Sequence, residues 1–572
     1  MPSLSRRHPL VDPLACAALL TLAAAVLLLP GLGLMAAHDT TDARYLEVAR
    51  EMWASGDWVT PHLAGVPHLH KPPLAYWAAA GGFSVLGATP FAGRLLEQAA
   101  VAGTAIAIFA FARRRIGGAS GWIAAGVFLT SGLVFATSRA LNTDLFQLLF
   151  LTCALIALFE GSAGSVAATA VAGAFLGLAM LTKGPVALLL TIVVVVPFLV
   201  LRRGERRLPA AGVALGVLLF VAIGLPWYAI QIARDPSLVS WFIDRQVMAR
   251  VAGGTEGHRH GLLYLPAHFL AGTLPWTPLV LLAAWRLRPR RGERLEALDV
   301  FLGCWLIAPC LVFELSATKL ASYLLPAMPA AALLVPRAQR SGLMEDGRAR
   351  GALVGALGIA GAAACAASVA LVCARYGLAP AWLETSDLRA PAAFALALAA
   401  LATLAGGLAV RTLLRPAHPS LRLPIAAIAA IFGLVGAAIA PAVRGHAHEA
   451  TIVSAVDGAE VIEYGVFEPG LLFYTAAPER FFVAMEKRRA RIAKQQPGAA
   501  HLGLRHEDVA ARVHRPVPTF VLAKSAHAAK LAEELGLERV QASPRYVLLA
   551  NPAAAAALGL VASDRTVARG PG

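Results

Sequence analysis

Apolar segments about as long as a bilayer is thick recur along most of the 572-residue chain, and this repetition limits its fold more than any other feature. A helix of about twenty apolar residues crosses the hydrocarbon core. Windows of that length predict 13 transmembrane helices, near residues 14–36, 91–111, 119–137, 144–160, 165–181, 185–201, 209–231, 262–285, 298–315, 321–336, 351–374, 391–410 and 421–442. The sequence therefore predicts a polytopic α-helical membrane protein.

The composition excludes an ordinary soluble domain. Hydrophobic residues make up 58% of the chain and charged residues only 15%, whereas soluble domains carry about a quarter charged residues. The net charge of +16 does not indicate a nucleic-acid partner, because the basic residues are mostly arginines in short clusters between apolar spans. The cysteines lack metal-ligand spacing and are expected to be small apolar core residues. They are Cys16, Cys153, Cys304, Cys310, Cys365 and Cys373.

The basic clusters alternate from loop to loop, which indicates the orientation in the membrane. They are Arg113 to Arg115, Arg202 to Arg207, Arg286 to Arg294, Arg337 to Arg350, and Arg411 with Arg415. We expect these loops and the N-terminus to be cytoplasmic. The first span, after Arg6 and Arg7, lacks a convincing cleavage site and is expected to be a retained helix. An odd number of crossings then places residues 443–572 outside.

The same alternation places the unusual polar segments together on the external face. These segments are residues 37–90, 139–144, 182–185, 232–261 and 316–319. A random scatter would divide them between the two faces, so their convergence predicts one external cavity. The predicted domains are a transmembrane domain over 1–442, with external loop helices in 37–90 and the loop 232–261, and an external domain over 443–572.

The external tail reads as a small α/β domain. Short strand-like runs occur at residues 451–454, 460–465, 471–474, 519–523 and 546–549, and residues 526–535 read as an amphipathic helix. The basic segment 487–491 is either a solvated helix face or a contact with anionic lipid headgroups.

A set of short motifs resembles one known family in both residues and order. The motifs lie at residues 42–58, 70–77, 142–144, 181–185, 258–259, 272–276, 316–326 and 464–474. Together they resemble the lipid A aminoarabinose transferases and the wider protein-mannosyltransferase superfamily, which are membrane glycosyltransferases of the GT-C type. The resemblance implies transfer of a sugar from an undecaprenyl-phosphate or similar polyprenyl-phosphate donor to an external acceptor, most simply lipid A or another envelope glycolipid. It also implies a bacterial inner membrane location.

The chemistry of such a donor explains the residue types in the motifs. A phosphodiester leaving group needs cations, and the attacking group needs carboxylates near it. We expect the donor phosphate to contact Arg44, Tyr45, Lys71, Lys183, Lys319 and Tyr323. The candidate catalytic carboxylates are Asp42, Asp144 and Asp39.

Two of these candidates have alternative structural roles. Arg44, in a helix expected to begin near Asp42, is placed to pair with Glu47 or another loop acid. Asp144 precedes an apolar run and is a plausible helix N-cap. Lys71 precedes two prolines that stiffen the backbone, which suits a fixed phosphate contact.

The chain departs from the aminoarabinose transferase pattern at three points. Thr41-Asp42 stands where that family usually has Asp-Glu, so Asp39 is a possible substitute for the first acid. His70 stands where Glu is usual, and Ala321 where Pro is common. A different sugar or metal preference therefore stays open.

Histidines in two external loops raise the question of a divalent metal. Imidazole and carboxylate ligands suit zinc or manganese, and magnesium is a further candidate. His258 and His70 are the principal candidate ligands, with His68, His260 and Glu256 as further ones, although loop histidines are also common surface residues. No nucleotide cofactor is expected.

Two further functions remain open at the level of sequence. A protein O-mannosyltransferase-like enzyme would use a hydroxyl acceptor, so Asp42 or Asp144 would have to act as a base. A polytopic transporter of lipid or sugar would have a similar number of spans, but the chain shows no clear internal repeat.

Overall fold

The computed structural model forms two compact units, built from Met1–Leu34, His70–Gly82 and Arg94–Ala442, and from Met35–Leu69, Phe83–Gly93 and Val443–Gly572. The structure describes residues 12–37, 41–242, 260–288, 294–316, 318–343, 347–351, 353–355, 357–358, 403, 406–407, 411, 421–439, 447–484, 501, 503–542 and 545–560.

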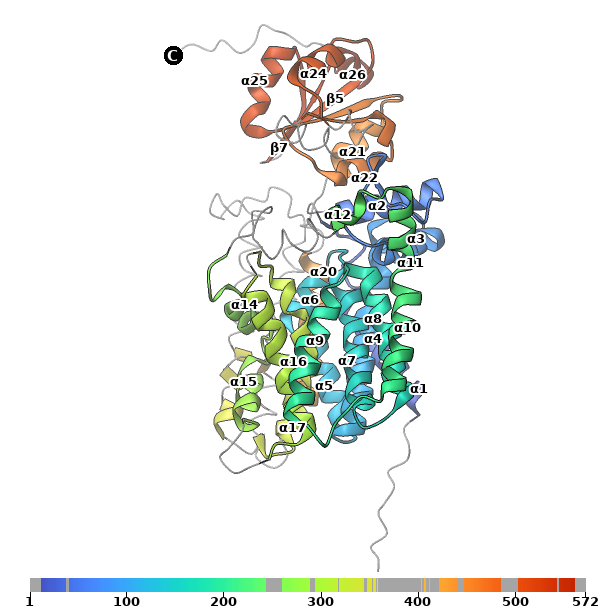
Figure 1. Cartoon of the computed structure of the whole chain (residues 1–572). Coiled ribbons are helices and arrows are strands. Elements are labelled where there is room, and N and C mark those ends of the chain that lie inside the picture. Colours follow the sequence, from blue (N-terminus) through green and yellow to red (C-terminus); the bar gives the residue numbers. More distant parts are fainter. Residues whose placement is uncertain are drawn as a thin grey trace, which may run out of the picture. The chain divides into compact units, whose positions relative to one another are not determined.

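The first unit is a bundle of apolar helices (Figure 1). Its helices are α1 (Pro13–Leu28), α3 (Leu74–Leu86) and α4 (Pro90–Arg115), both of which continue into stretches of the second unit, α5 (Ser120–Leu129), α6 (Gly132–Thr137), α7 (Asp144–Gly161), α8 (Val166–Lys183), α9 (Val186–Leu201), α10 (Ala210–Gly224), α11 (Pro226–Arg234), α12 (Leu238–Trp241), α14 (Tyr264–Gly272), α15 (Thr277–Arg286), α16 (Ala297–Glu314), the 3-10 helix η2 (Ala321–Ala327), α17 (Met328–Gln339) and α20 (Arg422–Ile439).

Among the described residues, four helices are long and apolar enough to cross a membrane: α4, α7, α8 and α16. The number rises to six if the bent pairs α10–α11 and α14–α15, which turn by 46° and 107°, are each one span. Helices therefore coincide with most of the predicted spans. The predicted span 119–137 is divided into α5 and α6, and the spans predicted at 351–374 and 391–410 fall mostly outside the described residues.

Helices α8 and α10 pack closely because glycines line their contact. A Cβ added to Gly173 would lie 1.9 Å from the carbonyl oxygen of Gly216. One added to Gly224 would lie 3.1 Å from the Cα of Gly177. Small residues let helix backbones approach in this way, as is typical of helices in membranes.

Four of the five predicted basic loops, those at residues 113–115, 202–207, 286–294 and 337–350, have described residues that gather at one end of this unit. Contacts link them in series: Arg115 with Glu160, the Arg206 guanidinium with the Phe159 ring, Arg202 with the Leu295 carbonyl, and Arg286 with the Ser341 carbonyl. These contacts join the ends of α4, α7, α9, α15 and α17. The polar segments at residues 142–144, 183, 261–263 and 314–323 are joined at the opposite ends of the helices.

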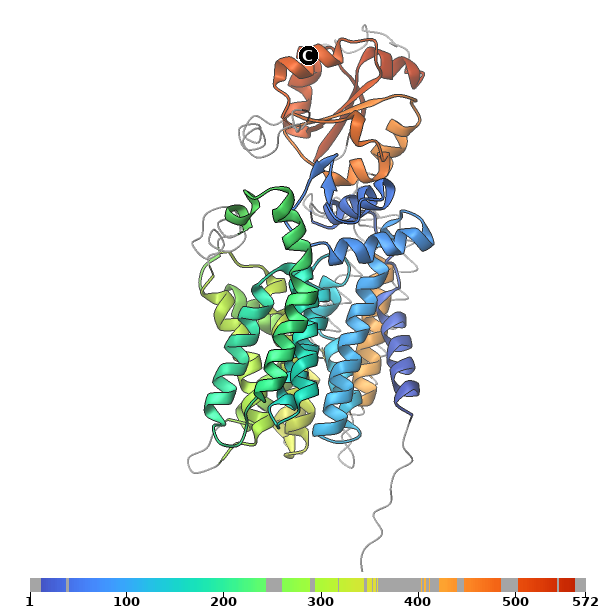
Figure 2. The same cartoon turned by 45° about the vertical axis from the view of Figure 1, so that its right-hand side comes forward.

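The second unit contains a five-stranded sheet in the order β4-β3-β5-β7-β6 (Figure 2). Strands β4 (Phe481–Ala484), β3 (Glu460–Tyr464) and β5 (Thr519–Lys524) are parallel, and β7 (Tyr546–Ala550) and β6 (Glu538–Ala542) add antiparallel pairs. The helices are α21 (Ala447–Ser454), α22 (Pro469–Thr475), the 3-10 helix η6 (Pro478–Arg480), α24 (His506–Val513), α25 (Ser525–Leu535) and α26 (Pro552–Ala557). This is the small α/β fold expected of the tail.

The first polar loop contributes to this same unit. Helix α2 (Asp42–Ser55) packs on α22, and the hairpin of β1 (His62–Leu63) and β2 (Val66–Pro67) follows it. Ala64 and Val66 belong to the apolar core that also contains Phe481 and Phe520 of the sheet. The Ala37 N–H donates to the Tyr474 hydroxyl at 2.8 Å. Residues far apart in the chain therefore build one core.

Two predicted strands are wrong. Residues 451–454 lie in α21, and residues 471–474 lie in α22. Pro469 and Gly470 begin α22, where proline suits the first turn because its ring presets the backbone angle φ. Each run is too short for periodicity to separate a strand from a buried helix. The basic segment 487–491 lies outside the described residues.

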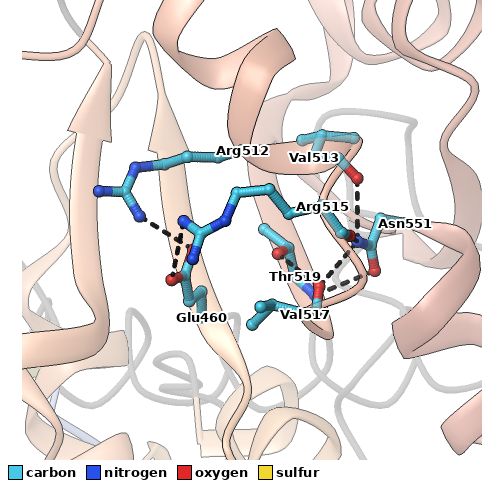
Figure 3. Close-up of polar contacts among 7 residues, drawn as sticks. All are labelled: Glu460, Arg512, Val513, Arg515, Val517, Thr519 and Asn551. Atoms are coloured by element: carbon cyan, nitrogen blue, oxygen red, sulfur yellow. Dashed lines mark hydrogen bonds and ion pairs between the residues drawn. The ribbon is translucent and has the colours of Figure 1, made fainter.

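A buried asparagine joins the end of β7 to the start of β5 in the second unit (Figure 3). The Asn551 side chain donates to the carbonyl oxygens of Val513 and Val517 at 3.0 and 2.9 Å and accepts from the Thr519 N–H at 3.0 Å. Nearby, Glu460 forms ion pairs with Arg512 and Arg515. Satisfied polar groups of this kind specify one arrangement of the loops that precede β5.

Candidate functional site

Helix α2 begins at Asp42, as predicted, and its polar side chains are largely buried within the second unit. Asp42 is fully buried, Tyr45 is buried, and Arg44 is half-buried. Arg44 lies 3.5 Å from the Thr41 hydroxyl, and its guanidinium carbon lies 5.8 Å from the Tyr45 ring. The predicted alternative, a pair of Arg44 with Glu47, is wrong because Glu47 is bound by Arg50.

The Glu47–Arg50 pair anchors this helix. Both guanidinium contacts measure 2.7 Å, and Glu47 is fully buried. Burial raises the pKa of Glu47 to about 8, while the guanidinium of Arg50 opposes that shift. The neighbouring Glu51 accepts from the backbone N–H groups of Ala64 and Gly65 at 2.6 and 3.0 Å, which fixes the hairpin on the helix.

His70 and Lys71 lie in the stretch that leads into α3, within the first unit. His70 is exposed and Lys71 is half-buried. Pro72 and Pro73 follow, and the Trp77 N–H donates to the Pro73 carbonyl at 2.8 Å as the helix starts. The rigid backbone predicted around Lys71 is therefore present.

The first unit brings together three predicted residues at one end of its helices. The Lys183 ammonium, on the last residue of α8, is bonded to a carboxylate oxygen of Asp144, the first residue of α7. The same nitrogen lies 5.1 Å from the centre of the Tyr323 ring in η2. The two charged side chains are 10% and 16% exposed, so most of their hydration is lost and the pairing must compensate for it.

Thr143 holds the N-cap position of α7, and Asn142, rather than Asp144, supplies the side-chain acceptor that caps its first N–H groups. Its side-chain oxygen accepts from the N–H groups of Asp144 and Leu145 at 2.8 and 3.3 Å. Asp144 is the first helical residue and points its carboxylate to Lys183. The alternative reading of Asp144 as an N-cap is therefore wrong, because the acceptor two residues earlier has taken that role.

The turn after Lys183 explains the motif at residues 181–185. Gly184 ends α8 with φ +85° and ψ −156°, a backbone conformation that is essentially restricted to glycine. Pro185 then caps α9. This turn ends α8 directly after Lys183 and so fixes the backbone position from which the lysine side chain extends.

Lys319 is buried in a separate contact of the first unit. Its ammonium lies 3.0 Å from a carboxylate oxygen of Glu314, at the end of α16, and 3.4 Å from the Gly261 carbonyl. The same oxygen of Glu314 accepts from the Leu263 N–H at 3.2 Å. Glu314 therefore links the entry of α14 to the segment that leads into η2.

The buried charges at the start of α4, the contacts of Arg139 and the pairing of Lys319 with Glu314 are not among the features predicted from the sequence. Glu97 and Arg94 are fully buried, and Glu97 accepts from the Asn142 N–H at 3.1 Å. Arg139 donates to the carbonyls of Leu28 and Pro30 at the end of α1. The available signal was the position of Arg94, Glu97 and Glu314 inside predicted spans, where ionisable residues usually have a pairing or functional role.

Three sequence-predicted site residues, Asp39, Glu256 and His258, lie outside the described residues. Within the described ranges, no group of three or more His, Cys, Asp or Glu side chains is arranged to hold a metal ion. The metal site therefore stays a prediction.

The geometry of the first unit suits an anionic ligand. Lys183 supplies a cation, Asp144 supplies a carboxylate that orients it, and Tyr323 supplies an aromatic face beside the ammonium. All three lie away from the basic end of the bundle. Such a cluster can bind a phosphate group and orient a second polar reactant.

Loss of Arg50 should destabilise the second unit strongly, because Arg50→Ala leaves the buried Glu47 without its partner. We expect a loss of about 3 to 5 kcal/mol in unfolding free energy, measured by thermal or denaturant unfolding of the full chain in detergent. Adding Glu47→Gln to this variant should recover part of the loss. Arg480→Ala removes a pair with Glu479 that is largely exposed and should cost less than about 1 kcal/mol. Equal effects of the two arginine variants would contradict this role of Arg50.

Comparisons with known proteins find similarity in sequence to one group of enzymes. The family of dolichyl-phosphate-mannose-protein mannosyltransferases matches residues 70–230. The undecaprenyl phosphate-alpha-4-amino-4-deoxy-L-arabinose arabinosyl transferase of Aeromonas hydrophila is 31% identical over 321 residues, which cover 54% of this chain and 56% of the relative. That of Pseudomonas aeruginosa strain PAO1 is 33% identical over 307 residues, covering 52% and 54%. The chain thus spans about half the length of the curated relatives it matches.

Solved structures show the same fold over nearly the whole chain. ArnT from Cupriavidus metallidurans bound to undecaprenyl phosphate aligns with a TM-score of 0.77 and 21% identity, covering 94% of this chain and 98% of that one. An oligosaccharyltransferase from Archaeoglobus fulgidus aligns with a TM-score of 0.51 and 12% identity, covering 92% and 71%. The predicted resemblance is confirmed: the chain is a polytopic helical membrane protein with the ArnT fold, similar in sequence to the aminoarabinose transferases and to the mannosyltransferase family.

Proposed function

We propose that the chain is a membrane glycosyltransferase that moves a sugar from undecaprenyl phosphate to lipid A or another envelope glycolipid. The observation that carries the proposal is the Asp144–Lys183–Tyr323 cluster in a bundle with the ArnT fold. The curated relatives are named for the transfer of 4-amino-4-deoxy-L-arabinose, which favours a pentosyl over a hexosyl donor.

The proposed reaction is a direct displacement at the anomeric carbon of the sugar. An oxygen of the acceptor forms the new bond to this carbon, the bond to the phosphate oxygen breaks, and undecaprenyl phosphate leaves with the electron pair. Lys183 would balance the charge on that phosphate, and Asp144 would hold the ammonium in place. A lipid A phosphate is already anionic at neutral pH, so it needs no strong base. Inversion at the anomeric carbon is expected from the family resemblance.

The other site residues predicted from the sequence are proposed to have the roles predicted for them. Arg44, Tyr45, Lys71 and Lys319 are proposed as further donor-phosphate contacts. The carboxylates Asp42 and Asp39 are proposed to orient the reactants.

We also propose the finer topology predicted from the sequence. It has 13 transmembrane helices in the bacterial inner membrane, a cytoplasmic N-terminus and a periplasmic C-terminal domain. The gathering of the arginine loops at one end of the first unit supports this orientation, because positively charged loops stay in the cytoplasm.

A second acceptor class has one observation in its favour. The matching family description names protein mannosyltransferases, whose acceptor is a protein. A hydroxyl acceptor would require a base, and Asp144 or Asp42 would have to supply it.

Mass spectrometry of lipid A should reveal the function directly. Cells that express the chain should carry a pentosamine increment that is absent without it, and Lys183→Met, Asp42→Ala and Lys71→Ala should each abolish the increment while the protein still inserts. Arg202→Met, which removes an ion pair at the basic end, should retain it. A hexosamine or uronic-acid increment would name a different sugar. An unchanged lipid A profile in wild-type cells would reject this acceptor, and full activity in the three variants would reject the site.

The Gly184 turn should matter for transfer beyond its effect on folding. Gly184→Ala forces an unfavourable backbone beside Lys183, and its new Cβ would lie 3.4 Å from the Tyr228 hydroxyl. Gly204, in the turn after α9 at the basic end, has the same φ of +85° and open space around its Cβ position. Each substitution should cost about 1 to 3 kcal/mol of stability. Transfer per folded molecule should fall about tenfold or more only in Gly184→Ala. Equal losses in both would contradict the role of this turn.

A divalent metal is proposed separately, with His70 and His258 as its ligands. Dialysis of the purified enzyme against a chelator should lower transfer, and zinc, manganese or magnesium should restore it. Elemental analysis should find less bound metal in His70→Ala and His258→Ala than in the wild type. Unchanged transfer after complete removal of metal would reject the proposal.

A further inference from the structure

Asn142 uses both ends of its side-chain amide at the start of α7. The oxygen accepts from the N–H groups of Asp144 and Leu145, and the nitrogen donates to the carbonyls of Thr137 and Ala140 at 3.1 and 2.7 Å. One side chain thus ties the end of α6 to the first turn of α7. The residue that it holds most directly, at 2.8 Å, is Asp144.

The backbone of Asn142 is itself held by a buried acid from another helix. Glu97 of α4 is fully buried and accepts from the Asn142 N–H at 3.1 Å. One residue further along α4, the Gln98 side chain donates to the Ser138 carbonyl at 2.8 Å. Helix α4 is therefore hydrogen-bonded to the α6–α7 turn at two points.

We propose that Asn142 is a positioning residue for the reaction. Asn142 fixes the carboxylate of Asp144 against Lys183, and Glu97 holds the backbone of Asn142 in place. The inference rests on the proposed function, since it assigns a role to a neighbour of the site. Asn142 is placed to act through Asp144, which lies between it and Lys183. Because Asn142 supplies the helix cap, the carboxylate of Asp144 is left to face the ammonium.

The chemistry of the amide explains why asparagine occupies this position. Serine at residue 142 would retain an acceptor for the cap but would lack the donor pair that reaches Thr137 and Ala140. Aspartate would also retain the acceptor, but its carboxylate would add negative charge near Glu97 and Asp144. The amide meets both requirements without adding charge.

A double-variant cycle tests this role. Asn142→Ala removes the cap and both donated hydrogen bonds. The start of α7 should then shift, and Asp144 should move with it. A misplacement of about 1 Å can lower a rate a hundredfold, so we expect transfer per folded molecule to fall between about tenfold and a hundredfold. In an Asp144→Asn background, the same substitution should change transfer by less than about twofold, since Asn142 would no longer have a carboxylate to position.

Binding of undecaprenyl phosphate supplies a second readout that needs no turnover. Its dissociation constant should be measured for the wild type, both single variants and the double variant. The double variant should match Asp144→Asn within about twofold. A purely structural role for Asn142 would instead multiply the same factor into both backgrounds, and that result would overturn the proposal. An unchanged single variant Asn142→Ala would overturn it as well.

Ser165→Ala is the matched control. The Ser165 hydroxyl caps α8, the helix that carries Lys183, but at the other end, where it accepts from the Ala168 N–H at 3.2 Å. Both variants lose one helix cap, yet only Asn142→Ala should lower transfer per folded molecule. Asn142→Ser and Asn142→Asp should recover part of the activity because they restore the cap. Equal losses in Ser165→Ala and Asn142→Ala would show a general effect of helix stability.

The cycle also separates this inference from the proposed function. If Asp144→Asn leaves both transfer and undecaprenyl phosphate binding unchanged, the proposed site is wrong. If Asp144→Asn lowers either one and Asn142→Ala lowers neither, only the positioning role is wrong.

Discussion

An ion pair taken largely out of water constrains the first unit more than any other contact. Lys183 and Asp144 sit at the ends of two apolar helices, where neither charge is stable without the other. This requirement fixes α7 against α8 at that end and explains the local features around them. Gly184 turns the chain directly after the lysine, and Asn142 takes over the cap so that the aspartate stays available. The aromatic ring of Tyr323 adds a third helix to the same point.

Much of this arrangement could be predicted because its signals are local. Apolar windows located α4, α7, α8 and α16, since a membrane requires each span to be apolar over its whole length. Asp144 and Lys183 are predictable from their charge and their place in external segments, and Tyr323 from the motif at residues 316–326. Short runs rich in β-branched and aromatic residues indicate β3, β5 and β7 in the tail. The 13-span topology and the roles of Asp42 and Lys71 stay predictions.

The parts that could not be predicted depend on distant partners. Glu97 meets Asn142 across 45 residues, and no pattern in either segment signals that contact. Lys319 pairs with Glu314, which lies inside the predicted apolar span 298–315. The runs in α21 and α22 are predicted as strands because short apolar runs are ambiguous; in the structure the two helices pack on each other, and α22 also packs on α2. Arg44 and Arg50 each lie three residues from Glu47 in the same helix, so spacing alone does not tell which arginine binds this buried acid, and the structure assigns it to Arg50.

The core of the second unit sets a limit on how the protein matures. Ala64 and Val66 pack in the same apolar cluster as Phe520 and Leu548, so one core joins residues of an early loop to residues that are translated much later. The early loop therefore reaches its final packing only after the last strands have been translated. Until then its apolar hairpin and the buried acids of α2 stay exposed to water and to other chains. Slowing synthesis near the C-terminus should prolong this vulnerable interval, and a truncated chain would never leave it.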